Sequence, residues 1–560
     1  MPVSKQNLIT VLIILVGISM LAWSVQPQTG LSDLHWYSIL PPLVAVVFAI
    51  ATQHLLLSLF AGVISGALLI NVPAAPLQAA SWMQSLETFL SLLWSVISDP
   101  FNLSVLTFII LMLVMISVVI LAGGLQAIVR WLGKFARGPR STQFVTTLMG
   151  FAVFIDDYAN VMIVGTSMRP VSDAMRISRE KLAFLVDATS APVAGIALMS
   201  TWIGYEVGIF AEVSNSLGFE RDAYSMFLDA LGFRFYCFFM LLFILINVWT
   251  GRDFGSMLRA EQRSRAGQLL AEDAVPPGNL GDAVKTDSKA RIRASAALLP
   301  FAVLFIVLFI GLWVDGGGMA LLAQSFGNLF SAGNWRDVVS ASENNVQVLN
   351  IAGLLSLLTA LVCAMLIAGL SFRRLLPALR KGAGAALYPW LILILAWTLG
   401  GICEQIQTGP FLVAVVGESM PAFIYPVVVF LLSAAAALAT GTSWGTMAIF
   451  IPITSQLAFQ LDGGTYGLIT IMCLAAVLDG AIFGDHCSPI SDTTIMSSIA
   501  TSCDHIHHVK TQFPYASVVG LTAIGLGYLP AVSGMPFWQS LILAGLLFLG
   551  FLRLFGRKVD

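Results

Sequence analysis

The chain has 560 residues, of which 58% are hydrophobic and only 10% are charged, with a formal net charge of -2. Soluble proteins carry about 25% charged residues, so this composition excludes a soluble globular protein, and the charge gives no reason to expect a nucleic-acid partner. No Walker A motif occurs, which leaves ATP-driven transport without support. We therefore predict an all-α polytopic membrane protein that has the lipid bilayer as its partner.

Apolar segments recur along the whole chain. A helix needs about 20 apolar residues to cross a bilayer. On this basis we predict twelve transmembrane helices, at 8–25, 38–52, 55–71, 101–123, 182–205, 230–249, 295–314, 346–370, 383–403, 466–500, 512–531 and 537–553. The first is long for a signal peptide and no clear cleavage site follows it, so we expect it to stay as a span.

The charged loops predict how these spans are oriented. Lys and Arg gather at 130–140, 169–181, 252–293, 373–381 and after 552, and almost none occur in 72–100, 206–229, 315–345 and 404–424. The positive-inside rule places the first set in the cytoplasm and the second set outside. We expect a bacterial-type inner membrane, with both termini in the cytoplasm.

Two further apolar segments do not fit as simple crossings. Segment 142–168 lies between two cytoplasmic loops, and each leg of a double crossing would reach only about 18–20 Å. We predict a re-entrant hairpin that enters from the cytoplasm, while a single ordinary span with one wrong charge assignment remains open. Segment 425–458 starts and ends on the outside by the same assignment of loops, so we predict a second hairpin that enters from outside.

The order of spans and hairpins predicts an inverted repeat. Residues 38–249 and 295–531 each contain five crossings and one hairpin, so the two halves have opposite orientations. The stretch Asp187, Ser190, Pro192 and Met199-Ser200 also aligns with Asp485, Ser488, Pro489 and Met496-Ser497. Segment 250–294 is then a cytoplasmic connector, and 1–37 and 532–560 carry the extra terminal spans. Inverted repeats with broken helices, here expected near Pro192 and Pro489, are typical of secondary transporters.

Polar residues inside the apolar segments are costly and are therefore functional candidates. Our candidates for ion or substrate binding are Asp156, Asp157, Asn160, Asp187, Thr189, Ser190, Thr442, Ser443, Asp485, His486, Ser488, Ser491, Asp492 and Thr493. Their oxygen atoms are the ligands that hard cations prefer. Structural alternatives stay open: a hydroxyl can bond its own helix, an Asp can cap a broken helix, and His486 can be a structural residue or a proton shuttle.

Adjacent Asp156 and Asp157 suggest how a cation and a proton could be exchanged. Carboxyl groups that are buried beside each other hold protons more readily, and an arriving cation favours their ionised form. Competition at a site that faces the two sides in turn is sufficient for antiport. We predict a transporter and not an enzyme, with transported Na+ and H+ and no cofactor. A channel and a homodimer remain open.

The run Gly484-Asp-His-Cys-Ser-Pro-Ile-Ser-Asp-Thr-Thr494 resembles the signature of the NhaC-type Na+/H+ antiporters. Runs 440–445 and 154–160 are similar to companion motifs of that family. The resemblance implies a scaffold domain with a mobile, hairpin-bearing transport domain. It also implies Na+ ligands at Asp157, Asn160, Asp187, Asp485 and Asp492. Relatives of this kind include carriers of organic acids and of amino acids, so a cation-coupled transporter or exchanger of a small organic solute remains the alternative.

Overall fold

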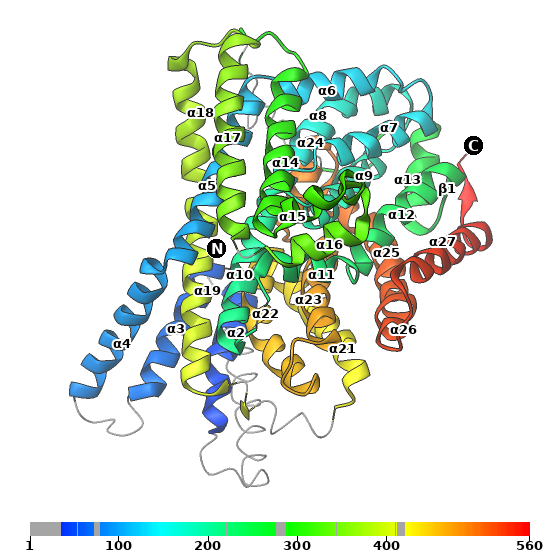
Figure 1. Ribbon diagram of the computed structural model, residues 1–560. Helices are drawn as coiled ribbons and strands as arrows, with labels where there is room; N and C mark the ends of the chain where they lie inside the picture. The colour runs from blue at the N-terminus through cyan, green and yellow to red at the C-terminus, as the bar shows by residue number, and fades with distance from the viewer. Residues whose placement is uncertain are drawn as a thin grey trace.

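The structure is a computed structural model that describes residues 35–52, 54–71, 79–219, 221–275, 287, 289–342, 344–408, 410–411 and 420–559. The predicted first span, 8–25, lies outside the described residues. The described chain is a bundle of helices with one short pair of strands (Figure 1).

The helices and strands follow one another in this order: η1 (Trp36–Ile39), α2 (Leu40–Thr52), α3 (Leu55–Asn71), α4 (Ala79–Ser98), α5 (Pro100–Leu121), α6 (Gly124–Gly133), α7 (Pro139–Ala152), α8 (Asp157–Ala174), α9 (Arg179–Ile196), α10 (Thr201–Leu217), α11 (Ala223–Leu231), α12 (Phe235–Thr250), β1 (Arg252–Asp253), α13 (Gly255–Arg265), α14 (Ser295–Asp315), α15 (Gly318–Gln324), η2 (Phe326–Phe330), α16 (Ala332–Ser340), α17 (Asn345–Leu366), α18 (Phe372–Ala385), α19 (Leu387–Gln405), η3 (Ala422–Ile424), α21 (Tyr425–Thr440), α22 (Ser443–Leu461), α23 (Leu468–Cys487), α24 (Asp492–Thr501), α25 (His505–Thr522), η4 (Ala523–Tyr528), α26 (Leu529–Val532), α27 (Phe537–Leu554) and β2 (Arg557–Lys558).

Many of these helices can cross a bilayer. Among the described residues, eight helices are long and apolar enough, and two bent pairs raise the number to ten. The bent pairs are α9 with α10, at 48°, and α11 with α12, at 44°. Helices α2 and α3, which match two of the predicted spans, are apolar but shorter than the rest. The protein is therefore an all-α, multi-pass membrane protein.

The chain breaks at the tips of both predicted hairpins. Helices α7 and α8 are separated at residues 153–156, and α21 and α22 at Gly441 and Thr442. Each pair packs together, the first in the upper half of Figure 1 and the second in the lower half. The next helix of each half also breaks: α9 ends before α10 at residues 197–200, and α23 ends before α24 at residues 488–491.

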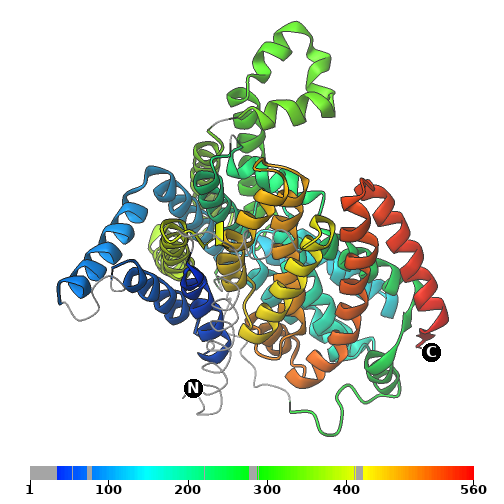
Figure 2. The ribbon, with the colours of Figure 1, turned by 90° about the horizontal axis from the view of Figure 1, so that it is seen from below.

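Several boundaries differ from the sequence prediction. The segment 206–229, expected as an outside loop, contains most of α10 and all of α11. A scarcity of Lys and Arg indicates on which side of the membrane a segment lies, but it does not show whether that segment is a loop or a helix. Segment 466–500 is not one continuous span but α23 and the short α24. Segment 315–345 contains α15 and α16 and projects from the body of the molecule (Figure 2).

The C-terminus is attached to the segment that follows the first repeat. Strand β1 pairs antiparallel with β2, so that Arg252 lies opposite Lys558. Helix α27 packs on α12 beside this pair. The buried core is formed largely by α5, α9, α10, α12 and α23, so the broken helices α9 and α23 lie within it.

Candidate functional site

The broken helices meet at one cavity of about 170 Å³. Residues from both halves of the chain line it: Leu113, Asp156, Asp157, Tyr158, Thr201, Trp202, Ala385, Tyr388, Pro389, Thr442, Ser443, Trp444, Asp485, Asp492 and Thr493. Four of these residues carry a carboxyl group, and none of the lining residues is a Lys, Arg or His. Seven of the sequence candidates are therefore brought together here.

The start of α8 contributes two adjacent carboxyl groups. Asp156 is the N-cap, and its carboxylate accepts hydrogen bonds from the Ala159 backbone N–H at 2.8 Å and from the Thr201 hydroxyl at 3.2 Å. Asp157 follows as the first helical residue and is 3% exposed. The first N–H groups of a helix have no partner within it, and an Asp N-cap satisfies one of them. Capping thus accounts for Asp156, whereas Asp157 lines the cavity and accepts the Tyr158 backbone N–H at 3.0 Å through one of its two oxygen atoms.

The start of α22 contributes hydroxyl groups instead. Gly441 ends α21 with a φ of +70°, and a Cβ at this position would lie 2.5 Å from the Ile490 carbonyl oxygen, so only glycine fits. Thr442 then caps α22 by accepting a hydrogen bond from the Gly445 N–H at 3.3 Å. The Ser443 hydroxyl donates to the Ala481 carbonyl at 3.4 Å. This tight turn brings the second hairpin tip against the break between α23 and α24.

The end of α23 and the start of α24 contribute the other two carboxyl groups. The Thr493 hydroxyl donates to Asp485 Oδ2 at 2.7 Å, whereas Asp485 Oδ1 is buried and has no hydrogen-bond partner among the described residues. Asp492 lies at the exposed edge of the cavity and accepts a hydrogen bond from the Tyr158 hydroxyl of α8. Ser491 caps α24 through the Thr494 N–H at 3.3 Å. The two halves are thus linked directly across the cavity.

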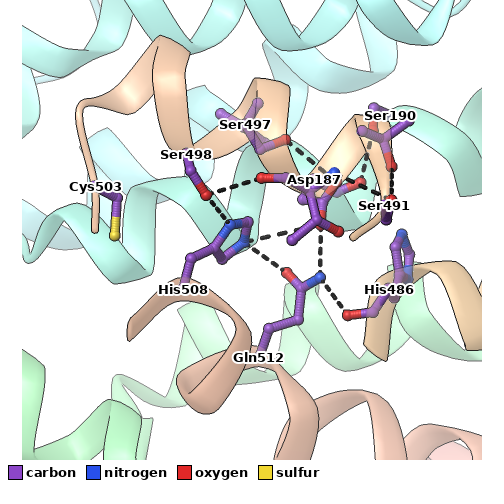
Figure 3. A network of polar contacts seen from close by, with 12 residues as sticks. Asp187, Ser190, His486, Ser491, Ser497, Ser498, Cys503, His508 and Gln512 are labelled. Atoms are coloured by element: carbon purple, nitrogen blue, oxygen red, sulfur yellow. Dashed lines mark hydrogen bonds and ion pairs between the residues drawn. The ribbon is translucent and has the colours of Figure 1, made fainter. Parts of the chain in front are cut away.

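Asp187 does not line the cavity but lies behind it in a second polar network (Figure 3). Its Oδ2 accepts a hydrogen bond from the Gln512 side-chain amide at 2.6 Å, and its Oδ1 accepts one from Ser497 at 3.2 Å. His508 Nε2 lies 3.8 Å from Asp187 Oδ2. The Thr494 hydroxyl is 3.2 Å from Asp187 Oδ2 and 3.4 Å from the Asp485 carbonyl oxygen, and so connects this network to the cavity wall.

Other candidates hold the surrounding helices in place. The Asn160 amide donates to the carbonyl groups of Gly150 at 2.7 Å and Val153 at 3.1 Å, which ties α8 to the end of α7. Thr189 and Ser190 each donate to a carbonyl of their own helix at 2.7 Å. These two hydroxyl groups therefore bond their own helix, which is the structural role considered above as the alternative to ion binding.

The remaining candidates lie at the end of α23. His486 Nδ1 is 2.9 Å from the Tyr236 hydroxyl, away from the cavity. The Ser488 hydroxyl donates to the Leu438 carbonyl at 2.8 Å and so holds the break against α21. Pro489 lies in this break as expected, whereas the break expected near Pro192 occurs a few residues further along the chain. Pro192 lies inside α9, and the chain breaks only after Ile196.

Sequence reasoning missed a buried ion-pair cluster that joins Arg234 to Glu206 of α10 and Asp479 of α23. The Arg234 guanidinium contacts Asp479 Oδ1 at 3.0 Å and Glu206 Oε1 at 3.4 Å, and all three side chains are fully buried. The sequence could have revealed this cluster, because Arg234 lies inside an apolar run and a buried charge requires a partner of opposite charge. Tyr158, Thr201 and the cavity's Trp and Tyr residues were also missed, because their types are common in membrane helices.

Broken helices that meet at a cavity with four carboxyl groups, inside a multi-pass helical bundle, are the architecture of a transporter. The chain belongs to the Na+/H+ antiporter family, because residues 193–530 match the model of that family.

The relatives agree with this membership. An uncharacterized protein of Haemophilus influenzae is 32% identical over 504 residues, which cover 88% of this chain and 90% of that protein. A malate-2H+/Na+-lactate antiporter of Bacillus subtilis is 30% identical over 150 residues, covering 27% of this chain and 31% of that one. The crystal structure of the YdaH transporter of Alcanivorax borkumensis, which is described as having an unusual topology, has a similar fold. Its TM-score is 0.51 at 14% identity, and the likeness covers 82% of this chain and 91% of that one.

Proposed function

We propose that the protein exchanges a monovalent cation such as Na+ for protons at the cavity between the two hairpins. The observation that carries this proposal is the group of four carboxyl side chains around one cavity with no Lys, Arg or His among the lining residues. Buried carboxylates require a compensating charge. A cation or protons from solution can supply that charge, and the two then compete for the same oxygen atoms.

The surrounding residues fit this role. Helices α8, α22 and α24 all begin at the cavity, and the partial positive charge of a helix N-terminus favours nearby carboxylates. Their caps, Asp156, Thr442 and Ser491, already bond the first backbone N–H groups. Asp485 therefore keeps a buried oxygen atom for a cation, and Asp157, whose Oδ1 accepts the Tyr158 N–H at 3.0 Å, offers its other oxygen. We further propose transport without catalysis in the inner membrane, with both termini in the cytoplasm and two inverted halves.

An exchanger of a small organic solute is the second candidate. The first turn of α22 contains no acidic residue, so its N-terminus, with Thr442 and Ser443, offers a place for a carboxylate. The partial match to a malate-2H+/Na+-lactate antiporter adds support for this alternative.

A flux assay separates the two candidates. The purified protein is reconstituted into vesicles that contain a pH-sensitive dye, and Na+ is added with and without malate, lactate or an amino acid. We expect Na+ alone to move protons. Proton movement that requires an organic solute would favour the second candidate, and a response equal to that of protein-free vesicles would contradict both.

A further inference from the structure

The cavity is larger than an inorganic ion needs. A water-sized site needs about 10–15 Å³ on the same measure, so about 170 Å³ has room for on the order of ten water molecules. Three oxygen-rich helix ends surround only part of this space. The rest of the wall therefore determines what else the cavity can hold.

Aromatic side chains form much of that wall. Trp202, Trp444, Tyr158 and Tyr388 all line the cavity. Trp444 is held in place, since Tyr205 stacks on it with ring centroids 4.3 Å apart and donates its hydroxyl to the Trp444 carbonyl at 2.5 Å. Trp202 packs edge-on against Trp444 at 6.1 Å. Tyr158 and Tyr388, which are 40% and 52% exposed, lie at the open edge.

Carboxyl groups beside aromatic rings recognise a particular class of ligand. Rings attract organic cations such as ammonium and guanidinium ions through their π-electrons, and carboxylates supply the opposite charge and hydrogen-bond acceptors. Asp485 Oδ1, which is buried and without a partner among the described residues, is such an acceptor. An organic acid would instead face four carboxyl groups and no basic side chain among the lining residues.

We propose that the cavity binds small organic cations, of the ammonium or guanidinium class, and exchanges them for protons. This inference rests on the proposed antiport function and gives it a cargo class. The carboxyl groups bind the charge of the ligand, and the aromatic wall binds its apolar surface.

The test uses the full-length protein in vesicles with an internal pH-sensitive dye. Guanidinium and tetramethylammonium are the probes, because they stay charged and do not cross the bilayer as neutral bases. Urea, malate and lactate are the matched neutral and anionic compounds. We expect both organic cations to evoke proton movement that is absent from protein-free vesicles and to compete with Na+, and we expect no response to urea.

Two outcomes would overturn the inference. In the first outcome, Na+ evokes proton movement, but neither organic cation evokes proton movement and neither competes with Na+. In the other, proton movement requires malate or lactate. If no cation, inorganic or organic, evokes a response, then the proposed antiport function itself fails.

Variants test the role of the wall. Trp444→Leu should raise the KM for guanidinium relative to that for Na+ by roughly five- to thirty-fold, as the loss of a cation–π contact predicts. Tyr388→Leu, at the exposed edge, provides a second variant if the first does not fold. Trp249→Leu is the matched control, since Trp249 is 70% exposed and does not line the cavity. An unchanged KM ratio in both cavity variants would contradict the role of the aromatic wall.

Discussion

Two neighbouring groups of carboxyl side chains are buried in this protein, and only one of them has a protein cation. Glu206 and Asp479 share the Arg234 guanidinium. At the cavity, Asp156, Asp157 and Asp485 are also buried, with Asp492 at the edge, but none of the described residues that line the wall is basic. A fixed cation makes a carboxylate part of the framework, whereas a carboxylate without one is available to an ion from solution.

The hydrogen bonds of Asp479 and Asp485 agree with this difference between the two groups. Asp479 also accepts hydrogen bonds from the Tyr236 N–H at 2.6 Å and the Tyr528 hydroxyl at 3.0 Å, so it is held from three sides. Asp485, in contrast, has one oxygen bonded to Thr493 and one without a partner among the described residues. We infer that the Arg234 cluster stabilises the fold and that the cavity carboxylates serve transport.

The largest expected effect is on stability. Arg234→Ala leaves Glu206 and Asp479 buried without their cation, which should lower the free energy of unfolding by about 3–5 kcal/mol. Thermal unfolding of the purified protein measures this. Arg374→Ala is the control, because Arg374 pairs with Asp287 at the surface, where a pair contributes about 1 kcal/mol or less. Equal effects in the two variants would contradict a structural role for the Arg234 cluster.

We expect the stability of the protein to depend on pH through Glu261, a buried carboxyl group whose burial is only partly offset by a neighbouring positive charge. Burial, and then the charge of Asp253, raise the pKa of Glu261 from 4.5 to about 7, against the Lys181 charge and the Ser178 hydrogen bonds, which lower it. The folded protein then holds this proton more tightly than the unfolded chain does. The stabilisation is complete below pH 4.5 and is lost as the pH rises through about 7.

Glu261→Gln removes this pH dependence. Relative to the variant, the wild-type protein should lose up to about 3 kcal/mol of stability over that pH interval. Unfolding temperatures measured across the pH range, with the exposed Glu272→Gln as control, test the expectation. Parallel pH profiles of wild type and Glu261→Gln would contradict it.

Removing a cavity charge should affect transport and not folding. Asp485→Asn keeps the size of the side chain but removes its charge, and we expect the affinity for the cation to fall by roughly ten- to a hundredfold. Vesicle flux at several Na+ concentrations measures the effect. Asp99→Asn is the control, since Asp99 caps α5 away from the cavity and Asn also caps helices well. If Asp485→Asn binds Na+ with wild-type affinity, the proposed difference in role between the cavity carboxylates and the Arg234 cluster would be contradicted.

The smallest effect is expected for the hydrogen bond that links the two halves. Tyr158→Phe removes the hydroxyl that donates to Asp492 and should cost about 1 kcal/mol, which is roughly fivefold in apparent affinity. Tyr466→Phe, which removes a Tyr–Asp bond at Asp229, provides the control. If both variants behave alike in the flux assay, the bond to Asp492 has no special role.

Part of this architecture could be predicted from the sequence. Charge counting located two interrupted apolar segments, and both interruptions, at 153–156 and 441–442, occur in the structure. The positions of Asp156 and Asp157 at the start of a helix follow from capping chemistry, which is local. These features depend on residues close together in the chain, so the sequence contains enough information to predict them.

The pairing of distant side chains could not be predicted in the same way. The sequence grouped Asp187 with Asp485, yet α9 continues through Pro192, and Asp187 faces Gln512 and Ser497 behind the cavity. A proline inside a helix can kink it without ending it, so the motif alone placed the break too early. Likewise, whether a buried carboxylate meets Arg234 or a cavity depends on tertiary packing.

The central claim is that a cation and protons compete for the cavity carboxylates. Its most direct test is the proton release of the purified protein when Na+ or guanidinium is added in weakly buffered solution, since this reads binding without transport. The account predicts proton release by the wild-type protein and a clear reduction in Asp485→Asn. No release by the wild-type protein, or equal release by the two, would contradict it.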